Sequence, residues 1–235
     1  MSKIEQICER LSQSIKEPKS ELKYISDYTF LIAVVMSAQT TDVQVNKVTS
    51  QLFAKYKTID DFLKLGVEGL QHEIRSIGFF RNKAKNIIKL SAQLKEKFNS
   101  KVPSNRKDLE SLAGVGRKTA NVVMNILFNK PTIAVDTHVL RLSKILGISK
   151  SDDPIKVEED LEKVIPNKYK NDISNLLVLH GRYVCKARKP DCSHCVLADL
   201  CPSKLQSSYG TNVCTGSQCC LKFSKMVRTI NFYVY

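Results

Sequence analysis

Four cysteines toward the carboxyl end constrain this chain more than any other feature of its sequence. They form the pattern C-x6-C-x2-C-x5-C at Cys185, Cys192, Cys195 and Cys201. Four thiolates so close together can enclose one metal centre, and thiolates suit both zinc and iron–sulfur clusters. The wide gaps differ from the paired knuckles of zinc ribbons, but the spacing alone leaves the two kinds of centre evenly supported. His194 lies between two of the cysteines and is interpreted as a non-ligand.

The composition is that of a folded protein with a polyanionic partner. Hydrophobic residues make up 43% of the 235 residues, and no apolar run approaches the ~20 residues of a membrane span. The first residues lack the apolar stretch of a signal peptide, which predicts a cytoplasmic protein without a membrane partner and disfavours disulfides. A formal net charge of +14 favours nucleic acid as the partner. The alternative is a basic protein whose charges are simply solvated.

Apolar residues recur at helical spacing along the chain, which predicts an all-α fold. The periodic segments are residues 3–15, 42–56, 83–98 and 117–128, and the continuous apolar segment 28–37 suits a buried helix. Glycines 66, 69 and 78 are expected to punctuate this pattern. Another helix is expected to end at Gly147, and a further one to open at Pro154 with Glu158–Asp160 in its first turn.

The segment Leu112–Lys118 combines two glycines with a lysine. Gly114 and Gly116 allow a tight turn, and the unpaired N–H groups of the helix that follows can bind a phosphate. Lys118 stands in the first turn of that helix, where the positive end of the helix dipole lowers the pKa of an amine. A neutral amine can attack an electrophilic carbon and form a Schiff base. The alternative is a solvated lysine that only contacts phosphate.

Asp136 follows three apolar residues and precedes a predicted helix, so it is expected to be the N-cap of that helix. Helix N–H groups would hold the carboxylate ionised. A fixed carboxylate stabilises the positive charge that a sugar gains when its base departs, as in glycoside hydrolysis. From the motif alone, a purely structural cap is the stronger alternative.

Together these motifs closely resemble the endonuclease III family of helix–hairpin–helix DNA glycosylases. The resemblance rests on Leu112–Val123, on Val135–His138, on Leu179–Tyr183 and on the four cysteines, in this order and at these separations. It extends over residues 1 to about 203. From about residue 204, serine, glycine and threonine dominate, which predicts a flexible C-terminal extension over 204–235. Its Cys214, Cys219 and Cys220 are not expected to be ligands.

The resemblance implies an all-α fold in two lobes. Residues 21–130 would form a six-helix lobe with the helix–hairpin–helix, and residues 1–20 with 131–203 would form the lobe of the cluster. The four cysteines would hold a [4Fe–4S] cluster with a structural or redox-sensing role. The implied partner is double-stranded DNA that contains damaged bases or abasic sites, bound by a monomer.

The implied activity is that of a bifunctional DNA glycosylase and AP lyase in base excision repair. A damaged base, usually an oxidised pyrimidine, is flipped out of the duplex. Lys118 would attack C1′ of its sugar, with Asp136 as the carboxylate partner, and β-elimination would cleave the strand 3′ to the abasic site. Gln39 would fill the hole left by the flipped base. Further DNA contacts are expected from the wedge residues Ile77 and Phe79, and from Gly114, Gly116, Arg117, His138, Arg182 and Lys189.

Two positions depart from the family pattern. Phe79 stands where leucine is frequent, and Ala113 stands where proline is usual, so the hairpin is expected to be slightly looser. Two alternative functions also remain. A monofunctional adenine mismatch glycosylase shares the fold and the cluster, but it lacks a lysine at the position of Lys118 and carries a further recognition domain. A non-catalytic DNA-binding protein with a structural metal would have no use for Lys118 and Asp136 together.

Overall fold

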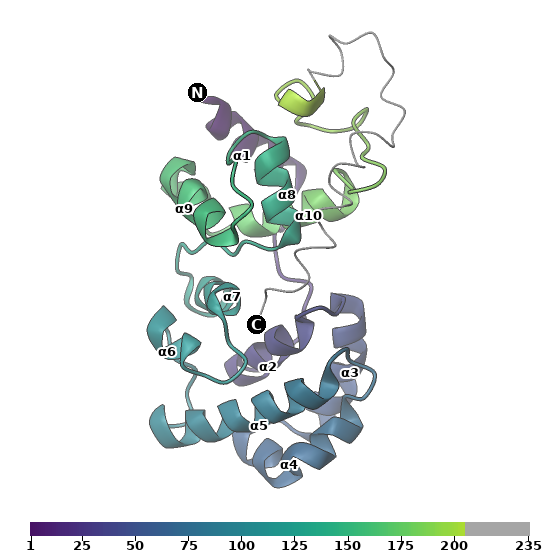
Figure 1. Cartoon of the computed structure of the whole chain (residues 1–235), viewed down its shortest axis with the longest axis vertical. Coiled ribbons are helices and arrows are strands. Elements are labelled where there is room, and N and C mark those ends of the chain that lie inside the picture. The colour runs from purple at the N-terminus through teal and green to yellow at the C-terminus, as the bar shows by residue number, and fades with distance from the viewer. Residues whose placement is uncertain (205–235) are drawn as a thin grey trace. The chain divides into compact units, whose positions relative to one another are not determined.

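Every regular element in the part of the chain that the structure describes, residues 1–204, is a helix (Figure 1). The computed structural model therefore confirms the all-α prediction. The elements in order are α1 (Lys3–Ser14), α2 (Asp27–Ser37), α3 (Asp42–Lys55), α4 (Ile59–Glu73), α5 (Phe80–Lys97), α6 (Arg106–Glu110), α7 (Arg117–Phe128), α8 (Thr137–Ile145), α9 (Pro154–Val164), the 3-10 turn η1 (Asn167–Tyr169) and α10 (Ile173–Tyr183). None of the helices within residues 1–204 has both the length and the apolar content needed to cross a membrane.

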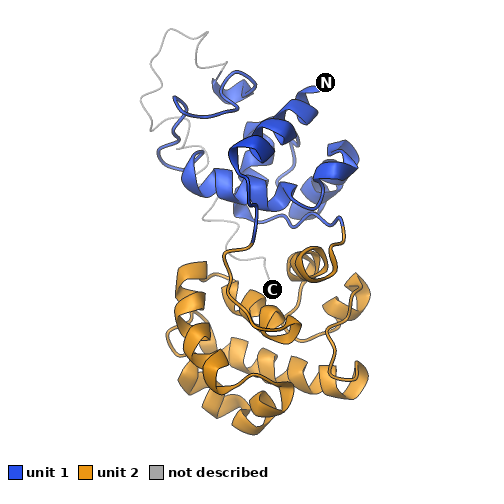
Figure 2. Cartoon of the chain, turned by 180° about the vertical axis from the view of Figure 1, so that it is seen from behind, with its two compact units in different colours: residues 1–19, 131–235 blue, residues 20–130 orange. Residues whose placement is uncertain are grey.

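The chain divides into two compact units, coloured separately in Figure 2. Unit 2 is the continuous stretch Ser20–Lys130 and contains α2 to α7. Unit 1 combines Met1–Lys19 with the chain from Pro131 onward and contains α1 and α8 to α10. The predicted extension, apart from Lys204, lies outside the described residues, and so do Cys214, Cys219 and Cys220.

The core of unit 2 forms around α2, which is apolar on all sides. Every residue from Tyr28 to Met36 is buried, and a helix without a polar face must be surrounded by other elements. Helices α3, α5 and α7 pack directly against it. Their inward faces carry the residues that the helical periodicity had selected, among them Val45, Leu52, Ile87, Leu90, Ala120 and Val123.

Local chemistry sets the helix boundaries of unit 2, with one surprise in α4. Thr58 and Asp61 form a capping box at the start of α4, each side chain accepting from the backbone of the other. Gly66 has a φ of 68° and kinks the helix, as a punctuating glycine should. The break expected at Gly69 is wrong, because this glycine lies inside α4 after the kink.

The core of unit 1 joins the two ends of the described chain. Ile7, Cys8 and Leu11 of α1 are buried against α10, and α8 packs on α10 as well. Helix α9 begins at Pro154 with Asp153 as its N-cap. The expectation that Glu158–Asp160 occupy its first turn is wrong, because they lie in the middle of the helix and Glu158 is buried.

Candidate active site and metal centre

The segment between α6 and α7 forms a tight turn. The N–H of Val115 donates to the carbonyl of Leu112 at 3.1 Å, and Gly114 has a φ of 78°. An i to i+3 hydrogen bond with positive φ at the third residue is the signature of a type II turn. Leu112 and Val115 are buried, which anchors the turn to the core of unit 2. We call residues 112–116 the glycine hairpin.

Helix α5 braces the glycine hairpin through one glutamine. The amide of Gln93 accepts from the N–H of Ala113 at 2.8 Å and donates to the carbonyl of Ser111 at 3.1 Å. A proline at position 113 would have no N–H to donate. The two hydrogen bonds of Gln93 thus restrain the turn where a proline ring would restrain it covalently. They oppose the looseness that was expected at Ala113, and Gln93 was not identified from the sequence.

The hairpin delivers the start of α7 to the surface. Gly116 is the N-cap of α7. Because glycine has no side chain, no capping side chain accepts from the first N–H groups of the helix. Arg117 is partly buried, while Lys118 is exposed in the first turn. An exposed amine beside such a helix terminus can meet both a phosphate and an electrophilic carbon.

Asp136 is the N-cap of α8, as predicted. Its Oδ1 accepts from the N–H groups of His138 and Val139, both at 2.8 Å. The segment that leads to it is held from the other side, because the hydroxyl of Ser174 on α10 accepts from the N–H of Ala134 at 2.9 Å. The two capping bonds use only Oδ1, so Oδ2 can face a substrate while the carboxylate stays fixed.

Lys118 belongs to unit 2, and Asp136 belongs to unit 1. The structure thus describes each group within its own unit. That the two meet at one sugar remains a prediction. It also remains a prediction that His138, Arg182 and Lys189 of unit 1 contact the same DNA as the hairpin residues of unit 2. Those hairpin residues are Gly114, Gly116 and Arg117.

Gln39 and Phe79 lie on neighbouring loops of unit 2, residues 38–41 and 76–79, which we call the paired loops. Both residues are exposed, and both adopt positive φ, 55° at Gln39 and 58° at Phe79. Few non-glycine residues adopt this conformation, and then because their surroundings hold them. Ile77 is 1% exposed and lies in the core, whereas Phe79 is exposed, so of the two residues predicted to form the wedge only Phe79 is accessible at the surface.

A buried lysine that sequence reasoning missed lies behind the paired loops. Lys83 on α5 is 7% exposed, and burial lowers its pKa to about 8. Its position did carry a signal, because Lys83, Ile87 and Leu90 share the i, i+4, i+7 stripe that faces the core. A lysine on such a stripe must find acceptors inside the protein.

The four cysteines lie at the end of α10 and in the loop that follows it. Cys185, Cys195 and Cys201 are partly buried against the core of unit 1, and Cys192 is exposed. None of the four forms a disulfide within the described residues. Lys204 reaches back to the carbonyl of Cys192 at 3.4 Å, which helps to close the loop. His194 turns toward Asp191 at 2.9 Å, as suits a residue that is not a ligand.

The donor set, four cysteine thiols on one loop, is of the kind that holds an iron–sulfur cluster. Within residues 1–204 no three His, Cys, Asp or Glu side chains form a group that could hold a single metal ion. Burial raises the pKa of the Cys185 and Cys195 thiols, so a bound metal must displace their protons.

Two side chains already face the sulfur atoms. The Nη1 of Arg141 lies 3.8 Å from the Sγ of Cys185, and its Nη2 donates to the carbonyl of Gly181 at 3.3 Å. The Nε2 of the buried His180 lies 3.6 Å from the Sγ of Cys195. Groups of this kind orient ligands and tune a metal centre. Neither residue was singled out from the sequence.

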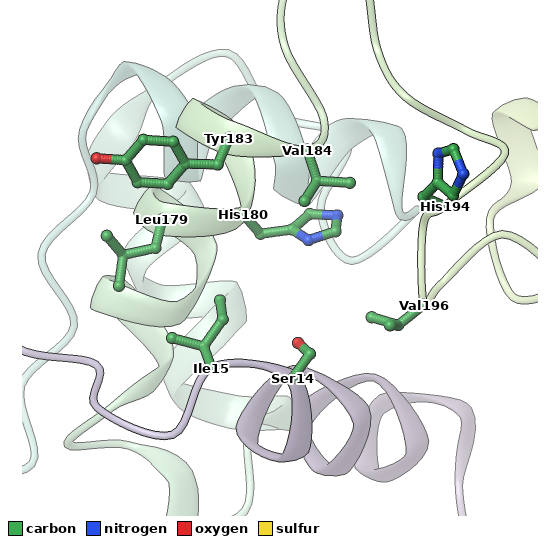
Figure 3. Close-up of a pocket in the computed structure, with 8 residues that line it drawn as sticks. All are labelled: Ser14, Ile15, Leu179, His180, Tyr183, Val184, His194 and Val196. Atoms are coloured by element: carbon green, nitrogen blue, oxygen red, sulfur yellow. The ribbon is translucent and has the colours of Figure 1, made fainter.

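A cavity of about 370 Å³ opens in unit 1 beside the cysteine loop (Figure 3). It lies between the end of α1, helix α10 and the segment 194–196, and its lining is mostly apolar. His180 and Tyr183 line it, but neither Lys118 nor Asp136 does. The cavity therefore holds none of the chemistry predicted for the active site.

Comparison with known proteins identifies relatives over most of the chain. Residues 32–167 match the family described as HhH-GPD superfamily base excision DNA repair protein. Residues 185–201 match the iron–sulfur binding domain of endonuclease III.

Individual relatives agree with these family matches. Endonuclease III of Haemophilus influenzae is 51% identical over 199 residues, which cover 85% of this chain and 94% of that protein. Endonuclease III of Escherichia coli (strain K12) is 47% identical over 199 residues, with the same coverage. Among solved structures, a trapped endonuclease III–DNA covalent intermediate matches with a TM-score of 0.82 and 44% identity, covering 88% of this chain and 99% of that one.

Proposed function

The chain belongs to the endonuclease III family of HhH-GPD base excision DNA repair proteins, and from this membership we infer how its own residues work. It is a DNA glycosylase with AP lyase activity, and it carries a [4Fe–4S] cluster. Its partner is DNA. We propose Lys118 as the nucleophile, Asp136 as its carboxylate partner and oxidised pyrimidines as the bases removed.

The observation that carries this proposal is the exposed amine of Lys118 in the first turn of α7. The glycine hairpin leaves the N-terminus of α7 without a side-chain cap, which suits a phosphate of the DNA backbone. A lysine in that same turn is then within reach of the sugar attached to that phosphate. The relative whose structure is titled a covalent intermediate with DNA supports a nucleophile in this family.

We propose the following sequence of bond changes. The Nζ of Lys118 bonds to C1′ as the bond from C1′ to the base breaks, and the base leaves with the electron pair and takes up a proton. Opening of the sugar ring breaks the C1′–O4′ bond, O4′ takes up a proton that the attacking nitrogen gives up, and a Schiff base results. Loss of a proton from C2′ then expels the 3′ phosphate, and water releases the lysine.

Asp136 has the geometry for the charge that develops in this sequence. Its Oδ1 is fixed by two N–H groups of α8, so no reorganisation is needed when positive charge appears on the sugar. Gln39 would occupy the place of the flipped base, and Phe79 would unstack the adjoining step. Phosphate contacts are proposed for Gly114, Gly116, Arg117, His138, Arg182 and Lys189.

Cys185, Cys192, Cys195 and Cys201 are the proposed ligands of the cluster. When bound, the cluster cross-links the loop after α10 and supplies redox-active iron. Arg141 and His180 hold their positive and polar groups toward the thiolates. The basic side chains of Lys186, Arg188 and Lys189 on the same loop are exposed and suit phosphate contacts.

We place the protein in the cytoplasm with the DNA, acting as a monomer.

Borohydride trapping tests the proposed chemistry. The wild-type protein and Lys118→Gln are each incubated with duplex DNA that holds thymine glycol, and borohydride is then added. The wild type is expected to form a covalent protein–DNA adduct, and Lys118→Gln is expected to form none while still binding the duplex. An adduct in Lys118→Gln would refute the assignment. Base release by the wild type without an adduct would point to a monofunctional glycosylase, and neither product would point to a DNA-binding protein.

A second substitution tests the cluster ligands. Cys192→Ser removes one thiolate and is expected to abolish the broad visible absorbance of the cluster and to lower the soluble yield. The matched control is Cys8→Ser, since Cys8 is buried in α1 and belongs to no proposed site. Absorbance equal to the wild type in Cys192→Ser would contradict the ligand assignment.

A further inference from the structure

Lys83 joins two loops that are far apart in the sequence. Its Nζ donates to the carbonyl of Met36 at 2.8 Å, to the carbonyl of Ala38 at 2.5 Å and to the hydroxyl of Thr40 at 3.0 Å. Its backbone N–H makes the first hydrogen bond of α5, to the carbonyl of the N-cap Phe79 at 3.1 Å. The side chain thus holds both neighbours of Gln39 against the helix that begins directly after Phe79.

Other contacts hold the second loop against the start of α3 and against the first loop. The side chain of Gln44 on α3 donates to the hydroxyl of Ser76 at 3.0 Å and to its carbonyl at 3.4 Å. A methyl group at Gly78 would lie 3.6 Å from the carbonyl oxygen of Gln39 and 3.7 Å from the hydroxyl of Thr40. The two loops therefore lie against each other, and the buried side chain of Lys83 contacts the first of them from the protein interior.

The paired loops hold Gln39 and Phe79 in a backbone conformation that non-glycine residues rarely adopt. Gln39 and Phe79 both adopt positive φ without being glycine, and both side chains are exposed, Phe79 by 56%. Residues in this conformation persist only where the surrounding structure over-determines them. The hydrogen bonds of Lys83 on both sides of Gln39, and the close approach of Gly78 to the carbonyl of Gln39, provide that constraint.

An ammonium group suits this position. The carbonyls of Met36 and Ala38 lie at the end of α2, where a helix presents its negative end to a cation. All three hydrogens of the ammonium have acceptors, so the group is both desolvated and satisfied. A buried lysine with every donor engaged is not free to attack a sugar, which separates Lys83 from Lys118.

We propose that Lys83 is a positioning residue that locks the paired loops into one rigid element, so that Gln39 and Phe79 enter duplex DNA together at the damaged base. The proposal rests on the proposed function of this family member. Lys83 touches neither the DNA nor the reacting atoms. Its contribution concerns only a duplex, because a single strand has no hole to fill and no stacked pair to wedge apart.

The test compares two substrates and two substitutions. Lys83→Met keeps the length of the side chain and removes the ammonium, and Lys85→Met is the matched control on the same helix, since Lys85 is exposed. Each variant and the wild type are given duplex DNA with thymine glycol, and separately a single strand with a preformed abasic site. We expect Lys83→Met to lose about 10- to 100-fold in kcat/KM on the duplex, because misplaced reacting partners cost rate on that scale. Borohydride trapping on the single strand should stay near the wild type in both variants.

A double-mutant cycle shows whether Lys83 acts through the loop. Lys83→Met combined with Gln39→Ala should lose little more on the duplex than Gln39→Ala alone, since the loop's side chain is already gone. Equal losses of Lys83→Met on the duplex and the single strand would overturn the proposal, because they would indicate a general loss of folding. Duplex activity equal to Lys85→Met would overturn it as well. A wild type that traps neither substrate would instead refute the proposed function, which keeps the two failures apart.

Discussion

The glycine hairpin and the paired loops both contain residues with positive φ, but they stabilise this conformation in different ways. At Gly114 positive φ costs little, because the residue has no Cβ. At Gln39 and Phe79 a side chain is kept, and the strain is held by Lys83, Gln44 and their partners. Where only the backbone approaches a phosphate, glycine can adopt positive φ without strain. Where a side chain must enter the duplex, glycine is excluded, and tertiary contacts must hold the strained backbone.

This difference also decides what the sequence can predict. The hairpin, the bounds of α7 and the cap at Asp136 follow from local chemistry, so glycine, the apolar stripe and a carboxylate before a helix suffice to find them. The neighbours of Gln39 are held by a lysine more than forty positions away in the sequence, and no local pattern encodes such a contact. The same reasoning explains Gln93, whose partner Ala113 lies on another element.

The kink in α4 and the start of α9 show the remaining limit. Glycine 66 breaks the helix and glycine 69 does not, although both have the same intrinsic preference. Glu158 lies beyond the first turn of α9 because Asp153 is the N-cap and the helix already begins at Pro154. In α4, by contrast, the local sequence does not distinguish the two glycines, and their surroundings decide between them.

Breaking the hairpin should have the largest effect. In Gly114→Ala the new Cβ would lie 2.9 Å from the Cβ of Asn86 on a backbone with a φ of 78°. We expect a loss of about 2 kcal/mol in the free energy of unfolding, because positive φ and the clash add. The matched control is Gly116→Ala, where nothing lies within 4 Å and φ is −96°. Urea denaturation measures both, and an equal loss in the two variants would show that the conformation of Gly114 is not the cause.

Removing the brace of the hairpin should cost less. Gln93→Leu deletes two hydrogen bonds at Ser111 and Ala113, each worth about 1 kcal/mol or less at a partly exposed site. Since Ala113 is the second residue of a type II turn, proline fits there. Ala113→Pro should therefore restore stability in the Gln93→Leu background and lower it in the wild type, where it leaves the Gln93 carbonyl unpaired. Thermal unfolding of the four proteins measures this coupling, and strictly additive effects would contradict the brace.

The paired loops should show a smaller dependence on pH. Burial lowers the pKa of Lys83 to about 8 from its ordinary value of 10.5. Between these values the unfolded chain binds more protons than the folded chain, so the contribution of Lys83 to stability rises with pH. From about pH 7 to about pH 9 the wild type should gain about 1 kcal/mol relative to Lys83→Met. Unfolding of both proteins across this range measures the difference, and a difference that falls with rising pH would have the wrong sign.

The assignment of the nucleophile is tested most directly by mapping the trapped adduct. Wild-type protein is reduced on a duplex with an abasic site, digested with a protease, and the peptide that carries the nucleotide is identified by mass spectrometry. The account predicts a single bond, between the Nζ of Lys118 and the sugar, on the peptide that follows the glycine hairpin. A nucleotide attached to any other lysine, Lys83 included, would contradict it.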